Sequence, residues 1–119
     1  MAYVDGYVLP LPKANVEAYR AMAFQVGAIW REHGALEYRE ALADDVQPGE
    51  HTSFPQAVQL KDDELVVLSW IVFESRAKRD EVNAKVMVDP RLKEWMDASK
   101  LPFDGKRMFW GGFEIMMTL

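Results

Sequence analysis

Two histidines, His33 and His51, are the only side chains here whose unperturbed pKa lies between about pH 5 and 8. His33 ends a segment with helical periodicity, where an imidazolium favours the helix dipole and can cap carbonyl groups. His51 follows Glu50 in a polar segment, where it could serve as a base or a ligand. Their positions favour a structural His33 and a solvated His51, and both stay candidates for proton transfer.

Three acids, Asp5, Glu40 and Glu114, lie inside segments with strand patterns. A half-buried carboxylate either pairs with a cation or has a raised pKa. Arg39, Lys106 and Arg107 are possible cationic partners, and an interface salt bridge is the favoured interpretation. An acid held beside a tyrosine could instead remove a proton from a small phenolic or enolic molecule.

Aromatic side chains could line a pocket, since an indole or phenol has an apolar body and a polar group that needs a partner when buried. The favoured interpretation of Trp70 and Trp110 is core or interface packing, on neighbouring strands. Should the chain be an enzyme, the candidate catalytic residues are His33, Asp5 and Tyr38, with Trp110 beside them. The candidate ligand-binding residues are Trp70, Trp110, Tyr3, Tyr7, His51 and Arg107.

No metal or cofactor motif stands out. The sequence has no cysteine, which excludes disulfides and thiolate chemistry. The histidines lack metal-ligand spacing, and Gly111-Gly112 lies within a strand pattern rather than in a phosphate loop. We therefore expect neither a cofactor nor a metal.

The composition indicates one soluble domain spanning residues 1–119, in which half of the residues are hydrophobic. The net charge of −5 opposes binding to nucleic acid, which depends on cationic groups. The strongest apolar run, Leu65 to Phe73, is far shorter than the roughly 20 residues of a membrane helix. No signal peptide is visible, so we expect a cytoplasmic protein.

Hydrophobic periodicity predicts the elements that must position these residues. Ser75 and the Asp89-Pro90 pair are typical of helix starts, and Gly34 of a helix end. A loop is expected from Asp44 to Pro55 and a solvated turn at 61–64. The predicted strands are 3–11, 36–42, 65–73 and 108–118, with a short edge strand at 57–60, and the predicted helices are 13–33, 76–88 and 91–98.

This order, β-α-β-β-α-β with an extra short helix before the last strand, is typical of an α+β, ferredoxin-like domain. Helices on one face of the sheet leave the other face bare. The segments 65–73 and 108–118 are nevertheless apolar on both faces, and we expect the last strand to sit deep in the fold. A symmetric partner sheet is the simplest cover for the second face, which predicts a homodimer.

Several segments together resemble the YbaA-like family of bacterial proteins, a domain-of-unknown-function family of the dimeric α/β-barrel superfamily. The resemblance implies a homodimer whose sheets close into a barrel with the helices outside, and it carries over no catalytic residue. The similar segments cover nearly the whole chain: 3–8, 32–38, 43–46, 52–55, 69–72, 75–80, 82–85, 89–92, 102–108 and 111–113.

Three functions remain open. The first is a binding module for a small apolar or aromatic ligand. The second is a cofactor-free enzyme, resembling a monooxygenase or an isomerase, that acts on small aromatic or quinone-like molecules; this rests on analogy of fold. The third is association with RNA, which the acidic composition opposes.

Overall fold

The computed structural model describes the backbone of residues 1–119 and every side chain except that of residue 98. Four antiparallel strands form one sheet in the order β2-β3-β1-β4. The strands are β1 (Tyr3–Pro12), β2 (Glu37–Leu42), β3 (Glu64–Phe73) and β4 (Phe109–Glu114), and the α-helices are α1 (Val16–His33), α2 (Phe54–Ala57), α3 (Arg76–Met87) and α4 (Pro90–Trp95). This arrangement confirms the predicted α+β, ferredoxin-like fold.

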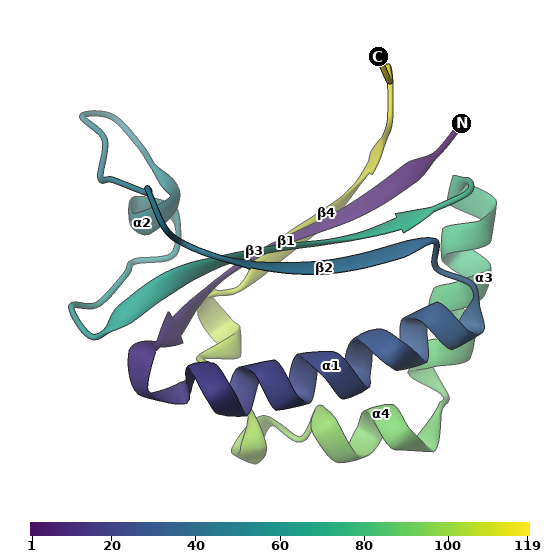
Figure 1. The fold of residues 1–119 in the computed structure, drawn as a ribbon, viewed down its shortest axis with the longest axis horizontal. Helices are drawn as coiled ribbons and strands as arrows, with labels where there is room; N and C mark the ends of the chain where they lie inside the picture. The colour runs from purple at the N-terminus through teal and green to yellow at the C-terminus, as the bar shows by residue number, and fades with distance from the viewer.

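Helices α1, α3 and α4 cover one face of the sheet (Figure 1). The odd-numbered residues of β1 lie on the face of the sheet that packs against the helices, and most of them are buried. Helix α1 packs against them through a stripe at three- and four-residue spacing, which includes the buried Tyr19, Ala23, Val26 and Trp30. Most of the hydrophobic core therefore lies between α1 and the two central strands.

The helix ends follow the sequence signals. The Ser75 hydroxyl accepts a hydrogen bond from the Lys78 backbone N–H at 3.1 Å and begins α3. Asp89 caps α4 in the same way, with Pro90 in the first turn. Gly34 ends α1 with a backbone φ of 123°, a value that residues other than glycine rarely adopt. No helix within the described residues is long and apolar enough to cross a membrane.

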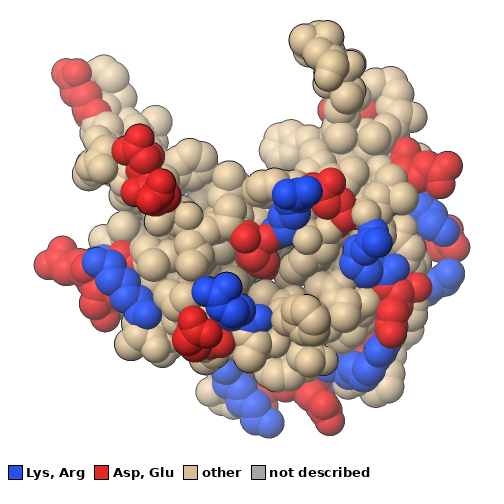
Figure 2. All heavy atoms as spheres, in the orientation of Figure 1, with Lys and Arg blue, Asp and Glu red and all other residues tan. Residues whose placement is uncertain are grey.

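The second face of the sheet is covered only at one end, where α2 places Val58 over Val8 and Val66. Elsewhere apolar side chains are open to solvent, among them Leu68, Phe109 and Phe113. Two segments, the loop before α2 and the C-terminal tail, project on this side, and a hollow lies between them in the space-filling view (Figures 1 and 2). We call this surface the bare face.

Three local expectations were wrong. Strand β4 is an edge strand beside β1, so the last segment does not sit deep in the chain, and its tail is exposed. Residues 57–60 form no strand, because Ser53 caps a helical turn at α2 and Gln59 then takes a positive φ of 52°. Glu64 is buried rather than solvated, because it begins β3 and pairs with Arg107.

Candidate functional site

A cavity of about 100 Å³ lies between the sheet and the helices. A second, more open hollow of about 230 Å³ adjoins it and shares three of its side chains, Tyr19, Tyr38 and Glu40. Together the two hollows reach the lower end of the roughly 300–1,000 Å³ typical of ligand pockets. The inner cavity is lined mostly by aromatic and apolar side chains: Tyr7, Leu9, Tyr19, Met22, Val26, Trp30, Tyr38, Glu40, Ser69, Ile71, Met96, Phe103 and Met108.

A row of polar-tipped side chains crosses the floor of this cavity. Glu40 of β2 lies opposite Ser69 of β3, and Ser69 lies opposite Tyr7 of β1. Tyr7 in turn lies opposite Trp110 of β4, and the two rings stack with their centroids 5.8 Å apart. Residues paired in this way share a face of the sheet at about 4.5–5.5 Å. The register alone therefore aligns a carboxylate, a hydroxyl, a phenol and an indole.

Glu40 is the acid of the cavity, and its partners are neutral. Its Oε2 accepts a hydrogen bond from the Tyr19 hydroxyl at 2.7 Å, and its Oε1 accepts one from the Tyr38 hydroxyl at 2.8 Å. Burial raises the pKa of Glu40 above its usual value, and the two hydroxyl hydrogen bonds oppose that rise. Burial and then the nearby Glu40 charge raise the pKa of both tyrosines, so both stay protonated donors.

Helix α1 makes room for this arrangement at Gly27. A Cβ at this position would lie 2.6 Å from the Tyr38 ring, closer than non-bonded atoms approach. The absent side chain lets the Tyr38 ring lie against the helix, where it also packs beside Trp30. A glycine in mid-helix, which weakens the helix in isolation, thus positions a side chain of the site.

A second polar cluster lies next to the cavity, behind Tyr7. Asp5 is fully buried, and its Oδ1 lies 3.6 Å from Nε of Arg79. Asn83 links this pair to Trp30, whose indole N–H donates to the Asn83 Oδ1 at 3.0 Å. Burial raises the pKa of Asp5, and the Arg79 charge and the Asn83 hydrogen bond oppose that rise. Asp5 therefore has a cationic partner, unlike Glu40.

Tyr3 belongs to the same cluster. Its hydroxyl accepts a hydrogen bond from Arg79 Nη2 at 3.0 Å, and the guanidinium lies 4.9 Å from its ring centroid. Neither Tyr3 nor Asp5 lines the cavity. Both are held by contacts that tie β1 to α3.

The two histidines lie away from the cavity and from each other. His33 Nε2 lies 2.9 Å from Asp89 Oδ2, which joins the end of α1 to the start of α4. Hydrogen bonds from Arg91 and then from His33 hold the pKa of Asp89 well below its usual range. His51 is exposed in the loop before α2. The structure thus brings neither histidine to Tyr38.

The two tryptophans of the expected pocket lie apart. Trp70 belongs to β3 and Trp110 to β4, and β1 separates these strands, so the expectation of neighbouring strands was wrong. Trp70 faces the bare face, where its indole N–H donates to Glu37 Oε1 at 3.1 Å. Trp110 faces the helix side and continues the polar row beyond the cavity. Of the candidate residues, the cavity brings together only Tyr7 and Tyr38.

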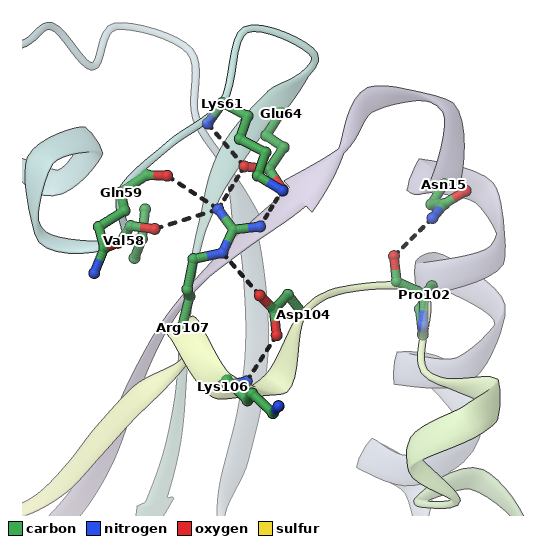
Figure 3. Close-up of polar contacts among 9 residues, drawn as sticks. All are labelled: Asn15, Val58, Gln59, Lys61, Glu64, Pro102, Asp104, Lys106 and Arg107. Carbon is green, nitrogen blue, oxygen red and sulfur yellow. Dashed lines mark hydrogen bonds and ion pairs between the residues drawn. The ribbon is translucent and has the colours of Figure 1, made fainter.

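Arg107 is held within the fold (Figure 3). Its two terminal nitrogens donate to the Glu64 carboxylate at 2.7 and 2.6 Å, and its Nε donates to Asp104 at 3.0 Å. The backbone carbonyl of Gln59 accepts a further hydrogen bond at 3.0 Å. The guanidinium fastens the connector before β4 to the start of β3, and these hydrogen bonds lower the pKa of Glu64.

Sequence reasoning favoured a cationic partner for Glu40, and this was wrong within the single chain, where its partners are tyrosine hydroxyls. The expected cations pair elsewhere: Arg39 with Glu37, and Arg107 with Glu64 and Asp104.

Sequence reasoning gave Tyr19 and Ser69 no functional role. Tyr19 reads as one more member of an apolar helical stripe, and only the register shows that Ser69 faces Glu40. The spacing of Tyr38 and Glu40, two residues apart in a strand, does place them on one face. No cluster of potential metal ligands occurs within the described residues.

The likeness to solved structures concerns the fold. SnoaB, a cofactor-independent oxygenase from Streptomyces nogalater, superposes with a TM-score of 0.62 at 13% identity over 99% of this chain and 96% of its own. A dimeric ferredoxin-like protein from an uncultured marine organism gives a TM-score of 0.63 at 10% identity over 99% and 98% of the two chains. At such identities the superpositions show the shared ferredoxin-like architecture alone.

The likeness in sequence is much stronger. The chain is 46% identical over 114 residues to the protein of Escherichia coli named uncharacterized protein YbaA, and the match covers 96% of each chain. The Shigella flexneri protein of that name matches equally. Residues 2–105 match the family described as "Protein of unknown function (DUF1428)". The chain therefore belongs to the DUF1428 family, together with the YbaA proteins.

Proposed function

We propose that this protein binds a small apolar or aromatic ligand in the cavity between its sheet and its helices. The observation that carries the proposal is the lining of that cavity, in which aromatic and aliphatic side chains surround a few polar groups. Ligand pockets combine an apolar wall with a few placed polar groups in this way. An apolar cavity of roughly 150 Å³ is enough to hold benzene. The outer hollow, at about 230 Å³, has room for a single ring, and the inner cavity adds about 100 Å³ beside the three side chains that the two share.

The proposal includes a homodimer formed through the bare face. Leu68, Phe109 and Phe113 are 39%, 46% and 62% exposed in the single chain, and they lie close together on one side of the sheet. A contiguous apolar patch of this kind usually marks an interface. A solved structure with the same fold is described as dimeric. The ligand cavity lies on the opposite side of the sheet.

An enzymatic role is the second candidate, and one observation favours it. Glu40 is a half-buried acid whose pKa is raised by desolvation, and it accepts hydrogen bonds from Tyr19 and Tyr38, the two hydroxyl-bearing residues that line both hollows. Acids tuned by burial are frequent at catalytic sites. SnoaB, which shares the fold, is described as a cofactor-independent oxygenase. The fold alone is compatible with either function.

We expect a cytoplasmic location and no association with RNA.

Calorimetric titration with a panel of single-ring aromatic compounds tests the binding function. We expect at least one compound to bind, and the variant Ile71→Trp, which fills the cavity from the sheet side, to abolish that binding. The control variant Met87→Trp adds the same ring at an exposed site outside the cavity and should leave affinity unchanged. Equal binding by both variants would contradict the proposal.

A further inference from the structure

Glu40 is half-buried, and it differs in its partners from the two buried acids, Asp5 and Glu64. Glu64 pairs with Arg107, and Asp5 faces Arg79. Glu40 receives only neutral hydroxyls, and no ion pair within the described residues includes it. The cation of the outer hollow, Arg20, is exposed and lies 3.4 Å from Glu17. A carboxylate that is partly removed from water and has no cation beside it gains from a further proton donor that reaches it.

Each oxygen of Glu40 still has acceptor capacity. An ionised carboxylate offers about four acceptor sites, and the two tyrosines use one on each oxygen. Glu40 lines the inner cavity and the outer hollow, so a molecule in that space can reach it. Because aromatic and aliphatic side chains surround it, a neutral hydroxyl is a better match than a hydrated ion.

The floor of the cavity also carries hydrogen-bond donors, which complement the acceptor Glu40. The hydroxyls of Tyr7 and Ser69 line the cavity next to Glu40 and take part in no hydrogen bond with another described residue. Both can donate to an oxygen of a ligand. Glu40, at one end of the row, can therefore accept a proton from a ligand. Tyr7 and Ser69, in the middle of the row, can donate hydrogen bonds to an acceptor atom of the same ligand.

We propose that Glu40, held by Tyr19 and Tyr38, is the proton acceptor for the hydroxyl group of a phenolic or enolic ring compound bound in this cavity. The inference rests on the proposed ligand-binding function and specifies its ligand class. The O–H bond of the ligand breaks, its electron pair stays on the ligand oxygen, and the proton forms a new O–H bond on Glu40. The new acid donates back to the ligand anion, while the Tyr7 and Ser69 hydroxyls stabilise charge delocalised to the far side of the ring.

The environment supports this direction of transfer. Desolvation makes the carboxylate a stronger base, because burial disfavours its charged form. The titratable groups facing Glu40 are Tyr19 of α1, Tyr38 of its own strand and Tyr7 of β1, and the pKa of each is raised by burial. None of the three competes for the proton, because all remain neutral phenols.

Two probes that differ in whether the ring oxygen carries a proton or a methyl group test the inference. The affinity of the unaltered protein is measured for para-nitrophenol and for its methyl ether, para-nitroanisole. We expect the phenol to bind about tenfold more tightly, the value of one hydrogen bond to a charged acceptor. We also expect the absorbance of the bound phenol to move towards that of its anion. Equal affinities would overturn the inference while leaving ligand binding intact, and binding of neither probe would overturn the proposed function itself.

Variants then locate the acceptor. Glu40→Gln should reduce the preference for the phenol to less than about threefold and remove the absorbance change, because an amide accepts a weaker hydrogen bond and takes no proton. Glu50→Gln, the same exchange at an exposed loop position, should behave as the unaltered protein does. Should Glu40→Gln fail to fold, Glu40→Asp keeps a carboxylate but withdraws it by one methylene, and the preference for the phenol should fall. Retention of the full preference by Glu40→Gln, or by Glu40→Asp where Glu40→Gln does not fold, would overturn the assignment.

Discussion

At the scale of single residues, Glu40 shows how strand register places an acid at the wall of an apolar cavity. The strand periodicity turns it towards α1, and the neutral tyrosines hold it without neutralising it. The sequence indicated a half-buried acid at this position, but not its partners. Its hydrogen bond to Tyr19 joins residues 21 positions apart and depends on how α1 packs on β2. Such contacts follow from tertiary packing, which local patterns do not encode.

Glu40 should make the stability of the protein depend on pH. Because its folded-state pKa is raised above the ordinary value of 4.5, its stabilising contribution is present below that pH and is lost as the pH rises through the folded-state pKa. Each unit of rise is equivalent to about 1.4 kcal/mol. We therefore expect Glu40→Gln to gain stability relative to the unaltered protein as the pH rises above about 4.5. Urea unfolding of both proteins at several pH values measures this difference, and a constant difference would contradict the raised pKa.

Gly27 provides a second test at this scale. Replacing a mid-helix glycine by alanine usually stabilises a helix by about 1 kcal/mol. Here the new methyl group would collide with the Tyr38 ring, so Gly27→Ala should instead destabilise the protein by about 1–3 kcal/mol and weaken ligand binding. Gly105→Ala, whose Cβ would meet only the Leu101 side chain at an ordinary 3.6 Å, is the control for thermal unfolding. A stabilised Gly27→Ala variant would contradict the close packing of Tyr38.

At the scale of elements, the sequence was most informative where one side chain sets the local backbone. Ser75, Asp89 and Gly34 fixed helix ends from their own chemistry, and the structure confirms all three. The sequence was least informative where an element depends on distant contacts. Strand β4 is apolar on both faces, which suggested a central strand, yet it lies at the sheet edge. Its apolar outer face belongs to the bare face, which one chain leaves uncovered.

The stability of the protein should depend on the ion pairs by which Arg107 joins the connector before β4 to Glu64. Arg107 and Glu64 are 12% and 4% exposed in their side chains, so Glu64→Gln would leave the guanidinium largely buried with a weakened partner. Losing one member of a buried pair costs about 3–5 kcal/mol, and this conservative exchange should cost somewhat less, about 2–3 kcal/mol. Lys85→Ala breaks the exposed pair with Glu81 and should cost less than about 1 kcal/mol. Similar unfolding free energies for both variants would show that the Arg107–Glu64 pair does not stabilise the protein.

At the scale of the whole molecule, the two faces of the sheet present different surfaces. The helix side encloses the cavity, while the bare face carries exposed apolar side chains between two projecting segments (Figure 2). The proposed homodimer uses the bare face, and the proposed ligand binds on the helix side. Because the two surfaces lie on opposite sides of the sheet, each can be altered separately.

The dimer is tested by a charge placed on the bare face. Leu68→Lys should convert the dimer into a monomer in sedimentation velocity at micromolar concentration, because a lysine opposite an apolar partner surface must be desolvated. Met87→Lys, at an exposed position of α3 away from the bare face, should remain dimeric. A monomeric unaltered protein would contradict the proposal, and so would a dimer that tolerates Leu68→Lys.

The most direct test of the central claim is an NMR titration of the isotope-labelled protein with para-nitrophenol. The cavity account predicts saturable shifts of the backbone signals of Tyr19, Tyr38, Glu40 and Ser69, with little change at Leu68 and Trp70 on the bare face. Shifts confined to the bare face, or none at concentrations up to the solubility of the probe, would contradict a ligand site between sheet and helices.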